Sequence, residues 1–239
     1  MLLELSSEQE FFQRTTARFL DGHAPVAELR RLRDDPAGFG RDYWRRGAEL
    51  GWTSLLAFEA DGGVAVSSNG LIDLTLVAHE FGRRAAPGPL VSTNVVAGAL
   101  SVGGGKQELI AGLLDGSVIG TWCFAEGAPS DGLGDIRLEI ALQGDELVLN
   151  GVKRPVESAD QADFFLVTGR TGEGLTQVVV PASTRGISLT PMRSVDLTRR
   201  FSMVKFDRVR VPAAQLLGRI GQADADVAEI EARHSHGDD

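Results

Sequence analysis

The chain has 239 residues and a formal net charge of −9, and 43% of its residues are hydrophobic and 24% charged. This is the composition of a packed globular protein, and it excludes a disordered or fibrous one. Its length is sufficient for two modest domains. The acidic balance, without Lys/Arg runs interleaved with aromatic residues, argues against a nucleic-acid-binding protein.

An anionic cofactor would have to meet a local basic patch on this acidic chain. Five arginines toward the C-terminal end provide one candidate, and a solvated strand surface accounts for them equally well: Arg193, Arg199, Arg200, Arg208 and Arg210.

Targeting signals are not evident. The N-terminus has neither a basic region nor an apolar stretch of signal-peptide length, and no window approaches the ~18 apolar residues of a membrane helix. The single cysteine, Cys123, has no partner for an internal disulfide, so the sequence predicts a reducing compartment, the cytoplasm.

Apolar residues recur at helical spacing from Ser6 to about Asp115. Ser7 followed by Glu10 has capping-box spacing, which predicts a first helix over 7–20. A short helix and a loop are expected next, followed by a helix over 41–50.

The strongest helical stripe predicts the following helix, which the Gly88-Pro89 pair should end. Two more helices are expected over 91–102 and 106–116. The stripe consists of Leu71, Leu74, Ala78, Phe81 and Ala85.

The hydrophobic period changes to that of strands from Val118 to Val211. A buried strand is predicted over 118–124, and a half-buried one over 136–142 turns at Gly144-Asp145 into the next. Further strands are expected at DFFLVTG, TQVVVP, GISLTP and MVKFDRVRV. Short strands at this spacing are typical of an antiparallel barrel or sandwich.

The pattern predicts an α+β chain in three parts. Residues 1–116 are expected to form an all-α domain, and 117–212 an antiparallel β-barrel or sandwich domain. Residues 213–239 are expected to form a short helical C-terminal stub, with a helix over 223–233.

Familiar catalytic and binding motifs are missing. No GxGxxG sequence occurs, which argues against a dinucleotide-binding fold, and the glycine-rich stretch before Lys106 lacks the remainder of a phosphate-binding loop. His234 and His236 have no third ligand, so no metal site is expected. Cys123 lies in an apolar strand and is interpreted as a core residue.

Five segments together resemble the acyl-CoA dehydrogenase family. Each is weakly specific alone, but their order and spacing cover nearly the whole chain. They are AELGWTSLLAFEADGG (48–63), TLVAHEFGRRAAPGPLVST (75–93), LLDGSVIGTWCFAEGAPSDG (113–132), LNGVKRPVESADQADFFLVTGR (149–170) and VVVPASTRGISLTPMRSVDLTRRFSMVKFDRVRVPAAQLLG (178–218).

The resemblance implies a helical domain, a β domain and a C-terminal four-helix bundle, of which this chain matches the first two. It also implies FAD as cofactor and an acyl-CoA as substrate, desaturated to the trans-2-enoyl thioester. Residues 122–130 would then line the flavin, and 155–157 would form a second flavin-facing strand. The residues carried over are Trp122, Phe124, Ala125, Ser130, Pro155, Val156 and Glu157, with Ser130 near the pyrophosphate or the CoA.

Three of these positions depart from the family pattern. Ala125 stands where Thr is commoner, Pro155 where Trp is commoner, and Glu157 where Thr or Ser is commoner. The loop around Pro129 is also one residue short. Loss of a hydroxyl and an aromatic face, and gain of a negative charge, predict weakened flavin binding, unless a divergent subfamily uses other contacts.

No counterpart of the bundle or of its catalytic carboxylate is found, so no catalytic residue is assigned, and Glu80 is interpreted as structural. Three hypotheses follow: a flavoenzyme incomplete without a partner chain, a non-catalytic acyl-CoA-binding or assembly subunit, or a degenerate remnant. The lone chain is expected to be inactive and to form a homo- or hetero-oligomer with a related chain. Because no bundle covers the β domain, an open face is expected at Trp122, Phe124 and Val156.

Overall fold

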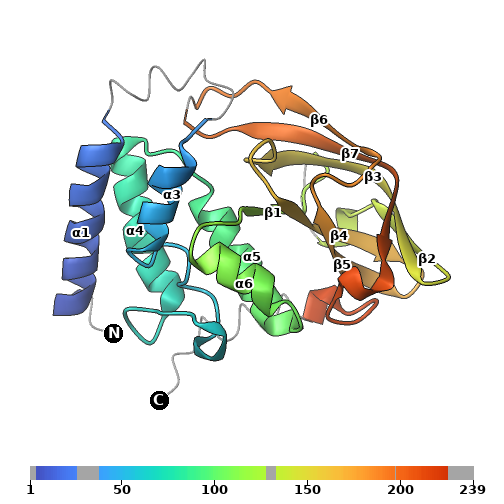
Figure 1. Cartoon of the computed structure of the whole chain (residues 1–239), viewed down its shortest axis with the longest axis horizontal. Coiled ribbons are helices and arrows are strands. Elements are labelled where there is room, and N and C mark those ends of the chain that lie inside the picture. Colours follow the sequence, from blue (N-terminus) through green and yellow to red (C-terminus); the bar gives the residue numbers. More distant parts are fainter. Residues whose placement is uncertain (1–3, 26–37, 128–132, 197, 226–239) are drawn as a thin grey trace.

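The computed structural model describes residues 4–25, 38–127, 133–196 and 198–225. Helices come first and strands second, and the two groups lie side by side (Figure 1). The helices are α1 (Ser7–His23), α3 (Arg41–Ala48), α4 (Gly70–Arg84), α5 (Leu90–Gly103) and α6 (Gln107–Leu114), with short 3-10 turns η1 (Glu59–Asp61), η2 (Leu133–Asp135) and η3 (Ala213–Gln215). The strands are β1 (Gly120–Cys123), β2 (Glu139–Gln143), β3 (Glu146–Glu157), β4 (Phe164–Thr171), β5 (Gly174–Pro181), β6 (Ile187–Met192), β7 (Phe201–Pro212) and β8 (Leu216–Leu217).

Helix α1 begins at Ser7 as predicted, but its cap lies one residue earlier than expected. Ser6 is the N-cap: its side chain accepts a hydrogen bond from the Gln9 amide, and the Gln9 side chain accepts one from the Ser6 amide. The predicted pairing of Ser7 with Glu10 is therefore wrong, although a capping box is present.

Buried polar contacts hold α1 on α4. Gln9 donates to Asp73 at 2.9 Å, and Gln13 donates to Glu80 at 2.9 Å. The buried Glu80 carboxylate also accepts from Arg84, so its position is that of a structural residue. The inward face of α4 carries Leu74, Val77 and Phe81, whereas Leu71, expected inward, is 46% exposed.

The strands form one mixed sheet in the order β6-β7-β3-β2-β4-β5-β8, with β1 pairing with β4. This confirms the predicted α+β class. The pairing is not wholly antiparallel, because β1 and β2 both run parallel to β4, and the sheet is not a closed barrel, because its hydrogen-bonded path has two ends. The predicted two-residue turn at Gly144-Asp145 is confirmed, since Gln143 pairs with Glu146.

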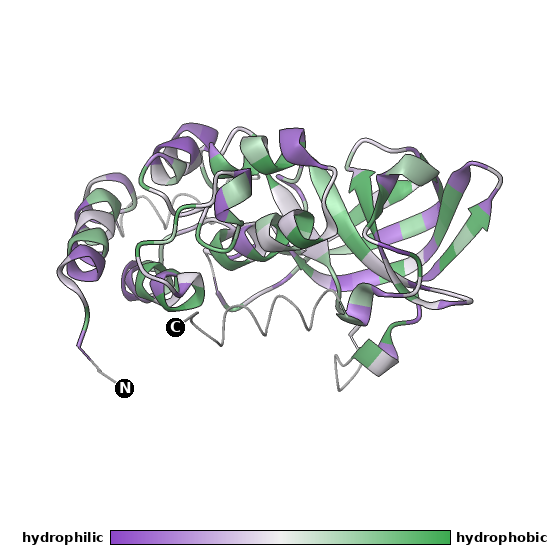
Figure 2. Cartoon of the chain, turned by 90° about the horizontal axis from the view of Figure 1, so that it is seen from below, coloured by the Kyte–Doolittle hydropathy of each residue, from purple (hydrophilic) through white to green (hydrophobic). Residues whose placement is uncertain are grey.

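The sheet curls around its own apolar core and packs its other face on helices. Cys123, Phe165 and Phe206 meet inside the curl, while α5 and α6 cover Phe164 and Leu166 on the opposite face. Figure 2 shows apolar and polar residues on the strands, and the central strands β4 and β5 are buried along most of their length because both of their faces are covered.

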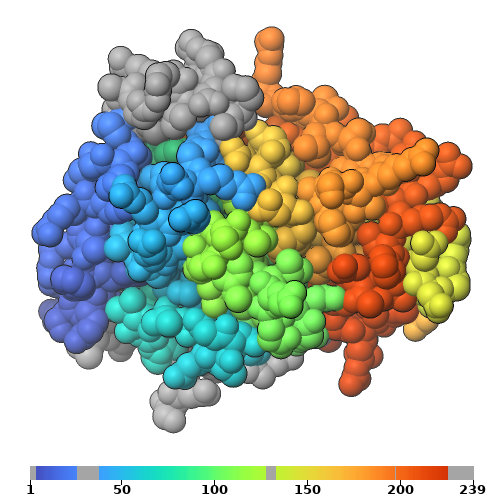
Figure 3. Space-filling view, in the orientation of Figure 1, coloured from blue at the N-terminus to red at the C-terminus, as the bar shows by residue number. Residues whose placement is uncertain are grey.

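The helices and the sheet are in direct contact. In Figure 3 the green segment of α6 adjoins the red segment after β7, where Lys106 donates to the Ala214 carbonyl at 2.6 Å. The division of the chain at residues 116 and 212 stays a prediction, and most of the helix expected over 223–233 lies outside the described residues. No helix in the described ranges is long and apolar enough to cross a membrane.

Candidate functional site

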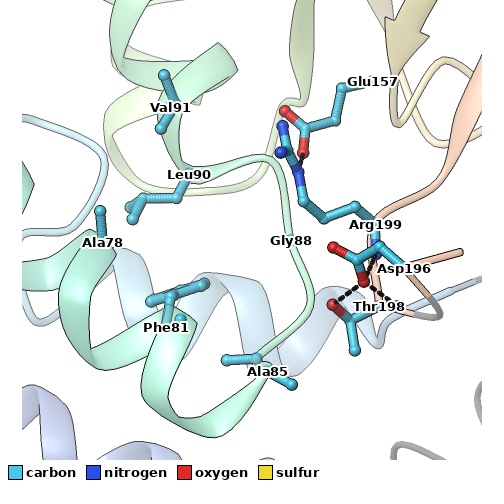
Figure 4. Close-up of a pocket in the computed structure, with 12 residues that line it drawn as sticks. Ala78, Phe81, Ala85, Gly88, Leu90, Val91, Glu157, Asp196, Thr198 and Arg199 are labelled. Atoms are coloured by element: carbon cyan, nitrogen blue, oxygen red, sulfur yellow. Dashed lines mark hydrogen bonds and ion pairs between the residues drawn. The ribbon is translucent and has the colours of Figure 1, made fainter.

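A groove of about 480 Å³ lies between the helices and the sheet (Figure 4). Helices α4 and α5 and the turn between them form its apolar wall, and the end of β3 and the segment before β7 form its polar end. The apolar wall consists of Ala78, Phe81, Gly82, Ala85, Ala86, Gly88, Leu90 and Val91, and the polar end of Glu157, Asp196, Thr198 and Arg199. A mostly apolar hollow with a few converging polar groups is the usual form of a small-molecule site.

The turn between α4 and α5 is fixed by its backbone. Helix α4 ends at Ala85, which has left-handed dihedral angles and donates its amide to Gly82 and Phe81 carbonyls. At Gly88, φ is +126°, and an added Cβ would lie 2.7 Å from the Trp44 ring. Only glycine fits this position, so the chain passes close to Trp44 and then enters α5.

An ion pair lies at the polar end of the groove. Arg199 Nε donates to Glu157 Oε1 at 2.7 Å, with side-chain exposures of 50% and 12%. The hydrogen bond to Glu157 raises the pKa of Arg199, against the opposing effect of burial. The guanidinium also lies 5.0 Å from the centre of the Phe201 ring, a cation–π distance.

Asp196 orders the segment that carries Arg199. Its Oδ1 accepts bonds from the Thr198 amide at 2.8 Å, the Thr198 hydroxyl at 2.8 Å and the Arg199 amide at 3.3 Å. Partial burial acts to raise the pKa of Asp196, but these bonds outweigh it and the pKa lies below its ordinary value. Asp196 is therefore an ionised structural group rather than a base.

Side-chain hydroxyls join the two strands beside the groove to α5. Thr121 of β1 donates to the Glu157 carbonyl of β3 at 2.7 Å, and the Ser92 hydroxyl of α5 lies 2.8 Å from that of Thr121. The backbone of Glu157 is thus fixed from the helical side as well as through the sheet.

The structure separates the residues predicted to face a flavin. Trp122 and Phe124 lie on one face of β1, are partly buried, and have ring centres 4.5 Å apart. The Trp122 indole donates to Thr168 at 2.8 Å. Partly buried Ala125 accepts the Arg154 amide through its carbonyl at 2.8 Å.

Val156 does not share that face. It is 0% exposed and belongs to the core inside the curled sheet, so its predicted exposure on an open face is wrong. The reason is strand alternation, since Val156 points to the opposite face from its neighbours Pro155 and Glu157. Pro155 is exposed and Glu157 turns toward the groove, whereas Ser130 lies outside the described residues.

A buried ion pair that the sequence reasoning did not identify supports this strand. Lys153 has a fully buried side chain and donates to Glu126 at 2.8 Å and to the Phe124 carbonyl at 2.7 Å. Glu126 also accepts the Arg137 and Leu138 amides at 2.8 and 2.9 Å. A lysine within the apolar pattern of β3 was the available signal, since buried charges require partners.

Of the described residues predicted to face a flavin, only Glu157 lines this groove. Apolar side chains cover one wall, and at the polar end the Glu157 charge is already compensated by Arg199. The terminal amino groups of Arg199 have no hydrogen-bond partner among the described residues, so they are available to a polar edge. The predicted penalty from Glu157 is accordingly smaller than that of an unpaired carboxylate.

The fold is an α+β module with a groove between its helical layer and its sheet. The family model described as acyl-CoA dehydrogenase, N-terminal domain, matches residues 6–116. The chain is 30% identical over 209 residues to the acyl-CoA dehydrogenase FadE12 of Mycobacterium tuberculosis, covering 80% of this chain and 51% of the relative. It is 25% identical over 232 residues to the mitochondrial isobutyryl-CoA dehydrogenase of Dictyostelium discoideum, covering 91% and 54%.

Solved structures share the same fold. A chain of the ChsE4-ChsE5 complex from Mycobacterium tuberculosis has a TM-score of 0.83 at 20% identity, with 98% of this chain and 62% of that chain covered. The Tcur3481-Tcur3483 steroid ACAD has a TM-score of 0.81 at 22% identity, with 99% and 64% covered.

The chain belongs to the acyl-CoA dehydrogenase family, a family of FAD-dependent flavoproteins. It spans about half the length of the curated relatives named above, 51% and 54% respectively.

Proposed function

We propose that this chain forms the helical and β parts of an FAD-dependent acyl-CoA dehydrogenase, and that it requires a C-terminal helical half to act. The observation that carries the proposal is the groove between α4, α5 and β3, with its apolar wall and the Arg199 guanidinium at one end. Bound FAD would supply hydride-accepting chemistry for the β-hydrogen of the acyl thioester, and a carboxylate base would take the α-proton.

The roles proposed for this chain are binding and orientation. Trp122, Phe124 and Ala125 on one strand, and Pro155 and Glu157 on the other, would support the flavin. Ser130 would contact the pyrophosphate or the CoA. Arg199 would meet a polar edge in the groove, and the apolar wall would exclude water from the reacting carbons.

The catalytic base is proposed to come from the C-terminal half. Glu80 and Glu126, two carboxylates in matching segments, are occupied by Arg84 and by Lys153. In the groove, Glu157 is paired with Arg199 and the pKa of Asp196 is lowered. A base must have an oxygen open to the substrate, and Glu80, Glu126 and Glu157 are each engaged by a cationic side chain, while Asp196 accepts three hydrogen bonds from its own loop.

The partner we propose is another acyl-CoA dehydrogenase-like chain, and the ligand an acyl-CoA. Support comes from the ChsE4-ChsE5 and Tcur3481-Tcur3483 structures, each of which contains two different chains. The buried thiol of Cys123 is compatible with a reducing compartment, and we place the assembly in the cytoplasm.

Flavin binding tests this proposal. The chain should be purified alone and after co-expression with candidate full-length relatives, and the flavin absorbance of each sample should be measured. Retention of FAD by the co-purified complex, with loss of flavin when Arg199 is replaced by Gln, is expected. A complex that never retains flavin would contradict the proposal.

A non-catalytic acyl-CoA-binding or assembly subunit is the second candidate. It is favoured by the ion pair of Glu157 and Arg199, which compensates the Glu157 charge in the groove without a ligand. Calorimetry separates the two functions, because acyl-CoA binding without FAD binding supports the subunit, whereas tight FAD binding supports the enzyme.

A further inference from the structure

A second hollow, of about 510 Å³, lies at the other end of the ribbon formed by β6 and β7. The strand register places Met192 opposite Phe201 near the groove, and Ile187 opposite Phe206 next to this hollow. Its lining consists of Thr184, Arg185, Gly186, Asp207, Arg208 and Arg210. Three arginines thus face one carboxylate in a chain whose net charge is −9.

Arg208 has an unfavourable backbone conformation. Its φ is +48°, in the left-handed region that favours glycine and asparagine. It lies where the register of β3 and β7 shifts between Leu149 and Gly151, and its amide donates to Asn150 Oδ1 at 2.8 Å. The fold therefore holds an arginine at a position where a smaller residue would be less strained, and such outliers cluster at functional sites.

Arg185 lies in the connection between β5 and β6. The following residue, Gly186, has φ +97°, and an added Cβ would lie 2.6 Å from the Asp207 carbonyl oxygen. The Asp207 amide donates to the Gly186 carbonyl at 2.9 Å. These contacts fix the backbone on both sides of the hollow.

The three guanidinium groups differ in how far they are already engaged. Arg210 is held by Glu146 and Gln143, each at 3.0 Å. Arg208 is 82% exposed, with Asp207 only at 3.6 Å, and Arg185 has no hydrogen bond or ion pair to any residue that the structure describes. Two guanidinium groups are therefore available beside a third of fixed orientation.

We propose that this hollow binds a phosphate group, carried by a nucleotide or by another small ligand. A phosphate presents several strong acceptor oxygens and up to two negative charges, which match neighbouring guanidinium groups better than a single carboxylate does. The strain at Arg208 is then the structural cost of placing a cation there. This site is separate from the groove and does not depend on the proposed dehydrogenase activity.

Isothermal titration of the whole chain with inorganic pyrophosphate tests the proposal, at a fixed ionic strength of about 0.1 M. Saturable binding is expected, weakened at least about tenfold by Arg185→Gln and by Arg208→Asn. The matched control is Arg14→Gln, which removes an exposed arginine paired with Glu10 on α1 and should leave the affinity unchanged. A parallel titration with ADP distinguishes a nucleotide site, which gains affinity, from a site for the phosphate alone.

Arg208→Asn separates binding from folding. Asparagine tolerates the left-handed conformation, so this variant should raise Tm by roughly 2–4 °C while it lowers pyrophosphate affinity. Equal affinity in the wild type and all three variants would overturn the proposal, as would the absence of saturable binding up to about 10 mM pyrophosphate.

Discussion

Arg41 of α3 and Asp163, the residue before β4, form an ion pair that joins the helices to the sheet. The Nη1 atom of Arg41 lies 2.7 Å from Oδ2 of Asp163, and its Nη2 atom lies 3.2 Å from Oδ1 of the same carboxylate. The same carboxylate accepts the Ile119 amide at 2.8 Å. One side chain therefore anchors α3 and the start of β1 to the strand that β1 pairs with.

Replacing Asp163 by Ala should destabilise the chain by about 1–3 kcal/mol, because the Ile119 amide loses its acceptor. The exposed part of the ion pair adds little to this. Asp42→Ala is the control, since Asp42 is almost fully exposed and lies 3.9 Å from Arg45. Chemical denaturation measures the free energy of unfolding of both variants. Equal losses of stability in Asp163→Ala and Asp42→Ala would contradict the anchoring role of Asp163.

Lys153→Met should destabilise the chain by about 3–5 kcal/mol, because it leaves the Glu126 carboxylate without its cation in a largely buried site. Lys205→Met is the control, because Lys205 lies on β7 with its side chain 55% exposed. Urea denaturation should show a much lower free energy of unfolding for Lys153→Met than for Lys205→Met. A loss below about 1 kcal/mol for Lys153→Met would show that the buried pair contributes little.

Gly88→Ala should destabilise the chain by about 2 kcal/mol or more, since alanine disfavours φ +126° and its Cβ would overlap the Trp44 ring. Gly82→Ala is the matched control within the same groove. Nothing lies within 4 Å of a Cβ at Gly82, which is inside α4, so this variant should be neutral or stabilising by up to about 1 kcal/mol. Thermal unfolding of both variants tests this; a neutral Gly88→Ala contradicts it.

Asp196 should contribute an acid-dependent part of stability. Its pKa is lower in the folded chain than in the unfolded one, so the contribution is complete above the unfolded value, about 4, and is lost as the pH falls through the folded value. Asp196→Asn should therefore show a shallower loss of stability between about pH 5 and pH 2 than the wild type. Parallel pH-dependent denaturation curves for the two proteins would rule this out.

The sequence predicted the helix bounds well where the local hydrophobic pattern determines them. For α5 the expected range was 91–102, and the helix runs from Leu90 to Gly103. The cap of α1 was misplaced because Ser6 with Gln9 and Ser7 with Glu10 have equal spacing. The choice depends on Gln9, whose side chain also reaches Asp73, 64 residues further along the chain.

The candidate site was less accessible from sequence. Val156 was carried over from the resemblance together with Pro155 and Glu157, but successive residues of a strand point to opposite faces, so Val156 enters the core. Arg199 was recognised only as one of five arginines, since its partner Glu157 is 42 residues away. Arg185 was missed for the same reason: only the pairing of β6 with β7 brings it near Arg208 and Arg210.

Enoyl-CoA formation tests the central claim most directly. The chain should be assayed alone and as a fusion to the C-terminal half of FadE12, the part of that relative that this chain does not match, with an acyl-CoA and an artificial electron acceptor. The account predicts no product from the lone chain and flavin-dependent product from the fusion. Turnover by the lone chain, or a flavin-loaded fusion that forms no product from any acyl-CoA, would contradict it.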